Sequence, residues 1–263
     1  MRSGVHTRIA PTPSGYLHLG NLANFLLIEK LAQEEGGTIA LRIDDCDGTR
    51  ARPEFVQHIF ETLDWLKLAW QGGPRNAADF YAQFSQTTRK AYYFQKLDAL
   101  APYLYACTCS RRDIEGVYAG ACREKNLPFV PGQTALRLHV NNTELAALFG
   151  DVVLWRKDDG PAYQWASVVD DLEAGVNLIV RGEDLRSSTE LQRYIAGILR
   201  PGGFGGIRFV HHPLLSGEDG KKLSKSQGAS SVVELRAAGV GAGELRAQLA
   251  PHVEKWAKSA VNK

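Results

Sequence analysis

The sequence predicts an α/β protein built on a parallel sheet. A β-type run extends from Val5 to Ala10, a turn rich in proline and glycine follows, and an amphipathic helical pattern runs from Leu22 to Leu31. A second strand pattern covers Thr38 to Asp44, and strand patterns return at 175–181 and 207–211. Several of these runs end in charged residues. Because open α/β sheets bind ligands at the carboxyl ends of their strands, these residues are candidates for a site.

The turn between the first strand and the first helix is the first candidate site. It reads Ala-Pro-Thr-Pro-Ser-Gly-Tyr-Leu-His-Leu-Gly-Asn from Ala10 to Asn21. A helix that starts here directs free N–H groups and the positive end of its dipole toward a phosphate. His18 stands at that helix start, and Gly20 lets another molecule approach the main chain. A lone histidine at such a turn is more often structural, so this pattern alone leaves both roles open.

A glycine-bounded stretch late in the chain is the second candidate site. Residues 217–228 read Gly-Glu-Asp-Gly-Lys-Lys-Leu-Ser-Lys-Ser-Gln-Gly. A charge run is usually a solvated surface, but here lysines alternate with hydroxyl groups and show no helical periodicity. This composition suits a loop that closes on a polyphosphate. We therefore expect Lys222, Ser224 and Lys225 to bind phosphates.

Together, the His-Leu-Gly-Asn and Lys-Leu-Ser-Lys-Ser stretches resemble the two signature motifs of class I aminoacyl-tRNA synthetases. The stretches at 41–45, 169–171 and 179–184 are similar to those of the glutamyl branch of that class. The resemblance implies a Rossmann-type catalytic domain that binds ATP with Mg²⁺. It assigns catalysis to His18, Lys222 and Lys225, and ATP binding to these three residues together with Gly20, Asn21 and Ser224.

Charged residues at strand ends are the candidates for binding an amino acid, which the resemblance identifies as L-glutamate. A buried arginine at a strand end, such as Arg181, needs an anion, and a carboxylate is suited to it. Asp44 can hold an ammonium group, at a position where most bacterial glutamyl enzymes carry glutamate. The resemblance implies that Arg8 contacts the amino acid and that Tyr163 lines its pocket. A tyrosine also suits the hydrophobic core, so the residue type alone leaves that alternative open. The full predicted glutamate-binding set is Arg8, Ala10, Pro11, Thr12, Asp44, Tyr163 and Arg181.

Clustered cysteines form a candidate metal site. Cys107, Cys109 and Cys122 lie within sixteen positions, and zinc favours thiolates from two short segments that fold back on each other. The fourth ligand is Tyr118, water or nothing, and a knuckle without metal is the alternative. Short glutamyl synthetase-like proteins resemble this pattern, with zinc held by two Cys, a Tyr and a Cys. The resemblance implies one structural zinc ion that stiffens an insertion near the tRNA acceptor end.

The positions of these motifs predict the domain organisation. We expect residues 1–100 and 161–228 to form the two halves of the catalytic domain. Residues 101–160 are predicted to form the inserted zinc-binding and acceptor-end module. Residues 229–263 are predicted to be a short helical C-terminal segment, with no anticodon-binding domain.

Two segments carry more specific expectations. The pattern from Phe84 to Leu100 predicts one helix, with Tyr92 and Phe94 among its core residues. The segment from Pro161 to Asp171 is expected to re-enter the main sheet. Its final residues, Asp170 and Asp171, are interpreted as positioning residues near the start of a helix.

Bulk composition excludes several classes of protein. The hydrophobic fraction of 44% and charged fraction of 23% are ordinary for a globular protein of 263 residues. There is no run of ~18 apolar residues, which excludes a membrane span. We expect no signal peptide, a cytoplasmic location and a monomer. The net charge of +2 neither indicates nor excludes nucleic-acid binding, which depends on a local basic face.

The resemblance, with the expected lack of an anticodon-binding domain, favours one activity. The chain is predicted to activate L-glutamate with ATP and to transfer it to the modified base queuosine of tRNA(Asp), as in the glutamyl-queuosine family. The first alternative is a truncated glutamyl-tRNA synthetase that charges a tRNA 3′ end. The second is a non-catalytic paralog that binds tRNA or a nucleotide.

Overall fold

The computed structural model describes residues 4–215 and 231–261. It consists of two compact units. The first contains Met1–Ser85, Gly175–Arg186 and Gly206–Lys263, and the second contains Gln86–Ala174 and Ser187–Gly205. The predicted module 101–160 falls within the second unit. In the described ranges, no helix combines the length and the apolar character needed to cross a membrane.

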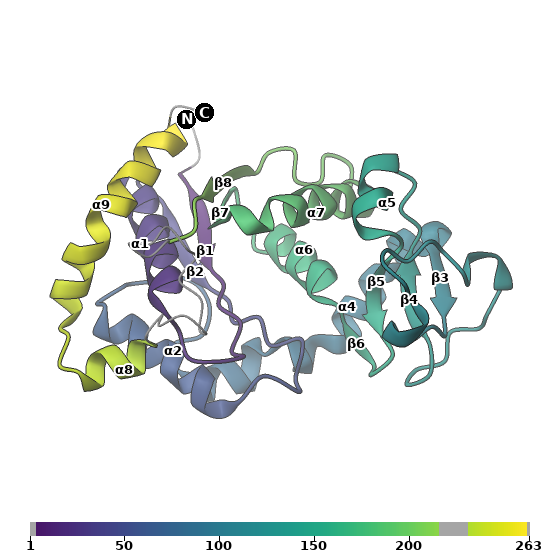
Figure 1. The fold of residues 1–263 in the computed structure, drawn as a ribbon, viewed down its shortest axis with the longest axis horizontal. Helices are drawn as coiled ribbons and strands as arrows, with labels where there is room; N and C mark the ends of the chain where they lie inside the picture. Colours follow the sequence, from purple (N-terminus) through teal and green to yellow (C-terminus); the bar gives the residue numbers. More distant parts are fainter. Residues whose placement is uncertain (1–3, 216–230, 262–263) are drawn as a thin grey trace. The chain divides into compact units, whose positions relative to one another are not determined.

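A four-stranded parallel sheet forms the centre of the first unit (Figure 1), which confirms the predicted α/β class. Its strands are β1 (His6–Ile9), β2 (Thr38–Leu41), β7 (Leu178–Gly182) and β8 (Arg208–His212), in the order β2-β1-β7-β8. In β1 and β7 nearly every side chain is buried, as expected for the central strands of a parallel sheet covered on both faces. Because all four strands are parallel, their carboxyl ends meet at one edge.

Helices surround this sheet. They are α1 (Leu19–Glu34), α2 (Pro53–Trp65), α3 (Ala77–Asp79), α8 (Val232–Ala237) and α9 (Ala242–Val261). Helix α9 lies alongside α1 (Figure 1) and buries an apolar stripe that includes Leu249 and Trp256. Arg246 of α9 donates to both carboxylate oxygens of Glu29 on α1, at 2.7 and 3.2 Å. These contacts make α9 part of the same hydrophobic core as the sheet.

The second unit contains an antiparallel sheet. Its strands are β3 (Leu104–Cys107), β4 (Ala135–Leu138), β5 (Val152–Arg156) and β6 (Gly160–Pro161), paired in that order. Four α-helices accompany them: α4 (Lys90–Lys96), α5 (Thr143–Phe149), α6 (Tyr163–Glu173) and α7 (Arg186–Leu199). The β3–β4 pairing brings Cys107 opposite Ala135, at the end of the sheet from which the cysteine-rich loops extend.

The structure corrects the expectation for residues 84–100. The single predicted helix is divided into a 3₁₀ turn at Gln86–Arg89, the short helix α4, and a 3₁₀ segment at Leu97–Tyr103. The core aromatic residue is Tyr93, which is fully buried, whereas Phe94 is 38% exposed. The hydroxyl of Tyr93 donates to the carboxylate of Asp170 at 2.8 Å, which offsets the cost of burying this polar group.

The expectation for residues 161–171 is also wrong. Apart from the short strand β6, this segment is the helix α6, so Asp170 and Asp171 lie near the end of a helix and not at its start. Asp170 is buried, and it accepts hydrogen bonds from Gln86, Arg89 and Tyr93 at 2.8 to 3.0 Å. It therefore fixes the segment around α4 to α6.

Candidate active site and thiol cluster

The carboxyl edge of the parallel sheet carries three of the predicted glutamate-binding residues. Arg8 lies in β1, Arg181 in the neighbouring strand β7, and Asp44 follows β2 on the other side of β1. All three are buried, with exposed fractions of 6%, 4% and 3%. Charged side chains are seldom buried unless they are paired or hydrogen-bonded, so their concentration at one edge marks a polar site.

Asp44 forms a close ion pair with Arg42. The Arg42 Nε and Nη2 atoms donate to the two carboxylate oxygens at 2.6 and 3.3 Å. The backbone N–H of Asp44 donates to Pro11 O at 2.9 Å, which ties the end of β2 to the turn after β1. The carboxylate is therefore held in a fixed orientation by a guanidinium, a form of pairing that adds geometric specificity.

His18 is the N-cap of α1. Its Nδ1 atom accepts a hydrogen bond from the backbone N–H of Gly20 at 3.1 Å, and its own N–H donates to Asn21 Oδ1 at 3.0 Å. A nitrogen that accepts from an N–H group carries no proton. This geometry therefore assigns the ring proton to Nε2, so that Nε2 is a hydrogen-bond donor at the start of the helix.

Gly20 allows this arrangement of the ring. A Cβ atom at this position would lie 3.0 Å from His18 Cε1 and 3.1 Å from Nδ1. The imidazole therefore occupies the space that a side chain would fill. Asn21 completes the cap with its side chain, so this predicted ATP-binding residue has a structural role at the helix start.

The other predicted residues of this site are distributed as follows. Ala10, Pro11 and Thr12 form the turn after β1, where the backbone oxygen of Thr12 accepts from Ser14 N–H. Tyr163 is the first residue of α6 and belongs to the second unit. Lys222, Ser224 and Lys225 lie outside the described residues.

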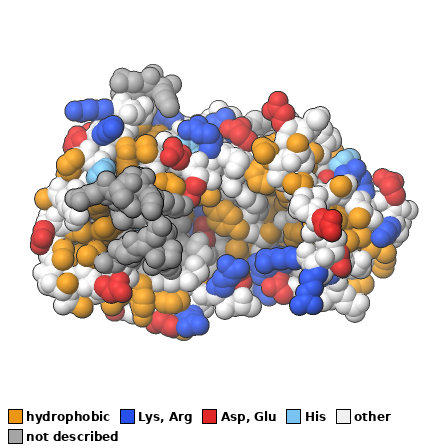
Figure 2. All heavy atoms as spheres, in the orientation of Figure 1, with side chains coloured by type: hydrophobic (Ala, Val, Ile, Leu, Met, Phe, Trp, Pro, Cys, Tyr) orange, Lys and Arg blue, Asp and Glu red, His pale blue; other side chains and the backbone are white. Residues whose placement is uncertain are grey.

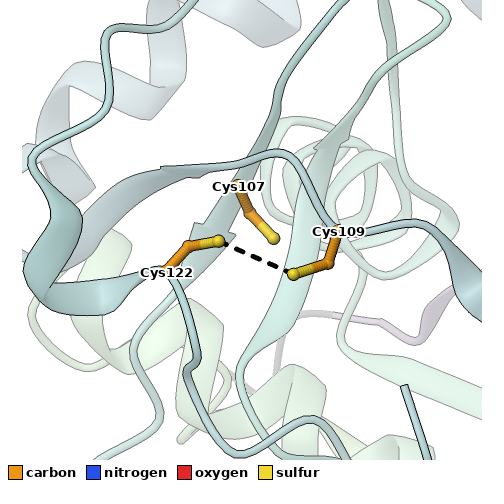
Figure 3. A group of neighbouring side chains, drawn as sticks. All are labelled: Cys107, Cys109 and Cys122. Carbon is orange, nitrogen blue, oxygen red and sulfur yellow. Dashed lines mark hydrogen bonds between the residues drawn. The ribbon is translucent and has the colours of Figure 1, made fainter. Parts of the chain in front are cut away.

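The three clustered cysteines lie together in the second unit (Figure 3). The Sγ atoms of Cys107, Cys109 and Cys122 are all within 4.8 Å of one another, and those of Cys109 and Cys122 are 3.6 Å apart. Four ligands arranged tetrahedrally at the usual Zn–S distance have sulfur atoms about 3.8 Å apart. The spacing of the thiols therefore fits zinc.

Tyr118 reaches the same cluster through its hydroxyl. The Oη atom is 3.3 Å from Cys107 Sγ and 3.9 Å from Cys109 Sγ, and it accepts from the backbone N–H of Cys122 at 2.9 Å. Burial raises the pKa of Tyr118, and the thiols add to this. Burial opposes ionisation of Cys122, but hydrogen bonds from the Thr108 backbone and the Tyr118 hydroxyl lower its pKa to about 6. The donor set thus contains three sulfurs and one phenol oxygen.

Sequence reasoning missed two residues that support these sites. Arg42 was not among the predicted residues, although an acid two residues away on the same strand face is a recognisable pairing signal. Arg137 lies in β4 over the ring of Tyr118, with Cζ 3.8 Å from the ring centre. Its only signal in the sequence was a charged residue inside a strand pattern.

The fold and the site define a family. A family model for "tRNA synthetases class I (E and Q), catalytic domain" matches residues 4–116 and 130–249. The chain therefore belongs to the E and Q family of class I aminoacyl-tRNA synthetases, and it is a ligase.

Among curated proteins, the chain is similar to members of this family with two different names. The chain is 37% identical to a protein named glutamyl-Q tRNA(Asp) synthetase from Synechococcus sp. (strain CC9605), over 98% of this chain and 86% of the relative. It is 34% identical to glutamate–tRNA ligase 2 from Halorhodospira halophila, over 88% of this chain and 53% of that protein.

A solved structure of a glutamate-tRNA synthetase is also similar to this chain. The glutamate-tRNA synthetase of Elizabethkingia anophelis superimposes with a TM-score of 0.71 at 25% identity. The match covers 86% of this chain and 53% of the solved chain, so the chain spans about half the length of that structure.

Proposed function

We propose that the chain activates L-glutamate with ATP and transfers the glutamyl group to the queuosine base of tRNA(Asp). The observation that carries the proposal is the carboxyl edge of the parallel sheet. There, Arg8 and Arg181 are buried in adjacent strands, and Asp44 lies at the end of the next strand. The two buried guanidinium groups suit the two carboxylates of glutamate, and the carboxylate of Asp44, which Arg42 orients, suits its ammonium group.

In the activation step, a glutamate carboxylate oxygen attacks the α-phosphorus of ATP. The bond to the bridging oxygen breaks, and pyrophosphate leaves with that electron pair. Arg181 is the proposed partner of the side-chain carboxylate, Arg8 contacts the amino acid, and Asp44 attracts the ammonium group. Such fixed pairs orient the reacting carboxylate before the reaction, which is a large part of catalysis for a step of this kind.

The phosphates of ATP are proposed to bind at the start of α1. The Nε2–H of His18 donates to a phosphate oxygen, and the helix N-terminus adds its positive dipole. Lys222 and Lys225, with Mg²⁺ bound to ATP, are proposed to neutralise the phosphate charge. Gly20, Asn21 and Ser224 complete the proposed ATP site.

The acceptor is proposed to be RNA. A hydroxyl group of the acceptor attacks the carbonyl carbon of glutamyl-adenylate, AMP leaves, and the hydroxyl proton passes to the leaving phosphate or to solvent. Figure 2 shows Lys and Arg side chains gathered over the α4 and β6 region of the second unit, a surface suited to a phosphate backbone. Lys90 is the first residue of α4, and Arg156 in β5 pairs with Gly160 of β6. Arg156 donates to Asp158 at 2.8 Å, and this hydrogen bond, with the charge of Lys90, lowers the pKa of Asp158.

One zinc ion is proposed to bind Cys107, Cys109, Tyr118 and Cys122. The spacing of the donor atoms supports this assignment. When bound, zinc supplies a structural cross-link between the loops that carry Cys109 and Cys122. The proposal gives zinc no part in the chemical steps.

A second candidate is glutamylation of a tRNA 3′ end. The 34% identity to a protein named glutamate–tRNA ligase 2, over 88% of this chain, supports it. The two candidates share the activation step and differ in the acceptor.

Transfer of labelled glutamate separates these candidates. The acceptors are tRNA(Asp) with queuosine, the same tRNA(Asp) with guanosine in its place, and tRNA(Glu). We expect labelling of the first RNA alone. Labelling of tRNA(Glu) alone would establish 3′-end charging, and labelling of both tRNA(Asp) forms would contradict queuosine as the acceptor.

A further inference from the structure

Arg137 is a buried cation in the second unit. It lies in β4 and is only 7% exposed. Its Nη1 atom donates to the backbone oxygen of Asp151 at 2.7 Å, whereas among the described residues its Nε atom has no hydrogen-bond partner. A buried guanidinium needs compensation for its lost hydration. The nearest compensation is the face of the Tyr118 ring, whose centre is 3.8 Å from Cζ.

Asp151 connects both members of this stack. Its backbone N–H donates to Tyr118 O at 3.1 Å, and its backbone oxygen accepts from Arg137. Its buried carboxylate accepts from Tyr105 Oη at 2.6 Å, from Arg123 Nη2 at 2.7 Å and from the backbone N–H of Val140 at 3.0 Å. A residue with this many partners is held rigidly, and it holds the Tyr118 backbone and the guanidinium in a fixed relation.

The backbone beside Tyr118 leaves little freedom. Gly150 has a φ of +61°, and a Cβ atom at this position would lie 2.2 Å from Tyr118 O. The main chain at Gly150 therefore packs directly against the main chain of Tyr118. With the backbone fixed on one side and the ring covered by Arg137, the hydroxyl of Tyr118 points to the thiols, 3.3 Å from Cys107 Sγ.

We propose that Arg137 is a positioning residue for the metal site, acting through Tyr118. This inference rests on the proposal that the thiol cluster holds zinc. Metal-bound cysteines are thiolates, so three of them exceed the charge of Zn²⁺ by one. The guanidinium, which lies over the face of the Tyr118 ring, balances this charge and holds the phenol as the fourth ligand. It thus has the role that outer partners have in other metal sites.

The test is the zinc affinity of purified full-length protein, measured by competition with a chromophoric chelator. Arg137→Met keeps the length of the side chain but removes the cation and the hydrogen bond to Asp151. We expect it to weaken zinc binding about tenfold, the lower range for loss of an outer-shell partner. Arg112→Met is the matched control, since Arg112 is an exposed arginine in the same loop region, and its affinity is expected to equal that of the wild type.

A double-mutant cycle tests whether Arg137 acts through Tyr118. We expect Tyr118→Phe to weaken zinc binding as well, and Arg137→Met to have no further effect in the Tyr118→Phe background. An equal tenfold loss in both backgrounds would overturn the proposal, as would wild-type affinity in Arg137→Met.

Two further results bear on the proposal: an Arg137→Met variant that does not fold, and a wild type that binds no zinc. If Arg137→Met does not fold, Arg137→Lys decides the matter, because lysine keeps the charge but not the planar stack. A loss of about threefold in its zinc affinity supports the proposal, and unchanged affinity overturns it. If the wild type binds no zinc, both the metal site and this inference are overturned. Glutamate activation is measured separately and does not depend on this result.

Discussion

The Nδ1 atom of His18 accepts a hydrogen bond from the backbone N–H of Gly20 at 3.1 Å. This single contact gives the ring two roles. It satisfies one of the free N–H groups at the start of α1, and it leaves the proton on Nε2, which can donate to an anion. The structural and the functional interpretations of His18 are therefore compatible, and a suitable pair of variants separates them.

We predict that His18→Asn retains stability but loses activity. Asparagine is a favourable N-cap residue, so the free energy of unfolding should change little. Without the Nε2–H donor, we expect the rate of glutamate-dependent ATP–pyrophosphate exchange to fall about 100-fold or more, as for the loss of a donor that stabilises a transition state.

His18→Ala is the companion variant. It removes the cap as well, and we expect the same loss of exchange together with a loss of about 1 kcal/mol in the free energy of unfolding, measured in urea. Exchange by His18→Asn within about threefold of the wild type would contradict the role of Nε2.

We predict that Gly20→Ala displaces the His18 ring. The new Cβ atom would lie 3.0 Å from Cε1, closer than ordinary van der Waals contact, so the ring must rotate or shift. A misplaced catalytic group lowers the rate by about 100-fold. The control is Gly243→Ala in α9, where a Cβ atom meets nothing within 4 Å. Equal exchange rates for the two variants would show that the close packing of Gly20 against His18 has no functional importance.

We predict that Asp170→Asn destabilises the second unit. Asp170 is buried and accepts from Arg89, Gln86 and Tyr93, so the variant leaves Arg89 with a weaker partner and breaks a charged network. The expected loss is about 3 kcal/mol in the free energy of unfolding.

Glu173→Gln is the matched control for Asp170→Asn. Glu173 pairs with the same arginine at 2.6 Å, but its side chain is 47% exposed. We expect a change below about 1 kcal/mol, the usual value for an exposed ion pair. Similar losses in the free energy of unfolding for both variants would show that the burial of Asp170 does not set its contribution to stability.

We predict that acid destabilises the first unit partly through His212. Burial lowers the pKa of His212, so the unfolded chain takes up a proton at a higher pH than the folded chain does. The free energy of unfolding should therefore fall as the pH is lowered from about 7.5 to about 5.5, a range that includes the ordinary histidine pKa. Urea titrations at several pH values measure this slope.

His212→Gln should reduce the slope, because the buried ring that resists protonation is gone. The ring of His212 stacks on Trp256, and His252 is an exposed residue beside the same Trp256, so His252→Gln is the control and should leave the slope unchanged. Parallel slopes for the wild type and His212→Gln would contradict the prediction. His58, whose pKa is also lowered by burial, is expected to supply part of the remaining slope.

Much of the first unit could be predicted from local patterns. The four strands and α1 follow from apolar periodicity, and the parallel edge follows from strand–helix alternation. The segment from Pro161 to Asp171 could not be assigned correctly, because its short, largely apolar run Trp165 to Val169 suits a buried helix as well as a buried strand. The buried aromatic residue is Tyr93 and not Phe94, and the hydroxyl of Tyr93 has its partner in Asp170, which is distant in sequence.

The candidate site shows the same limit. His18, Arg8 and Arg181 were singled out by their places at strand and helix ends together with the family resemblance, and their roles stay predictions. The capping contact of His18, the pairing of Asp44 with Arg42 and the stacking of Arg137 on Tyr118 depend on side-chain geometry. The order of residue types along the chain does not by itself determine such side-chain contacts.

The most direct test of the central claim is ATP–pyrophosphate exchange with L-glutamate, without RNA, in the wild type and in two arginine variants. We expect exchange by the wild type, at least a 100-fold loss in Arg181→Met, and no loss in Arg208→Met, whose arginine lies on β8 in an exposed pair with Glu35. Exchange that appears only with tRNA(Glu) would favour charging of a 3′ end. Absence of exchange with and without RNA, or equal exchange by both variants, would contradict glutamate activation at this edge of the sheet.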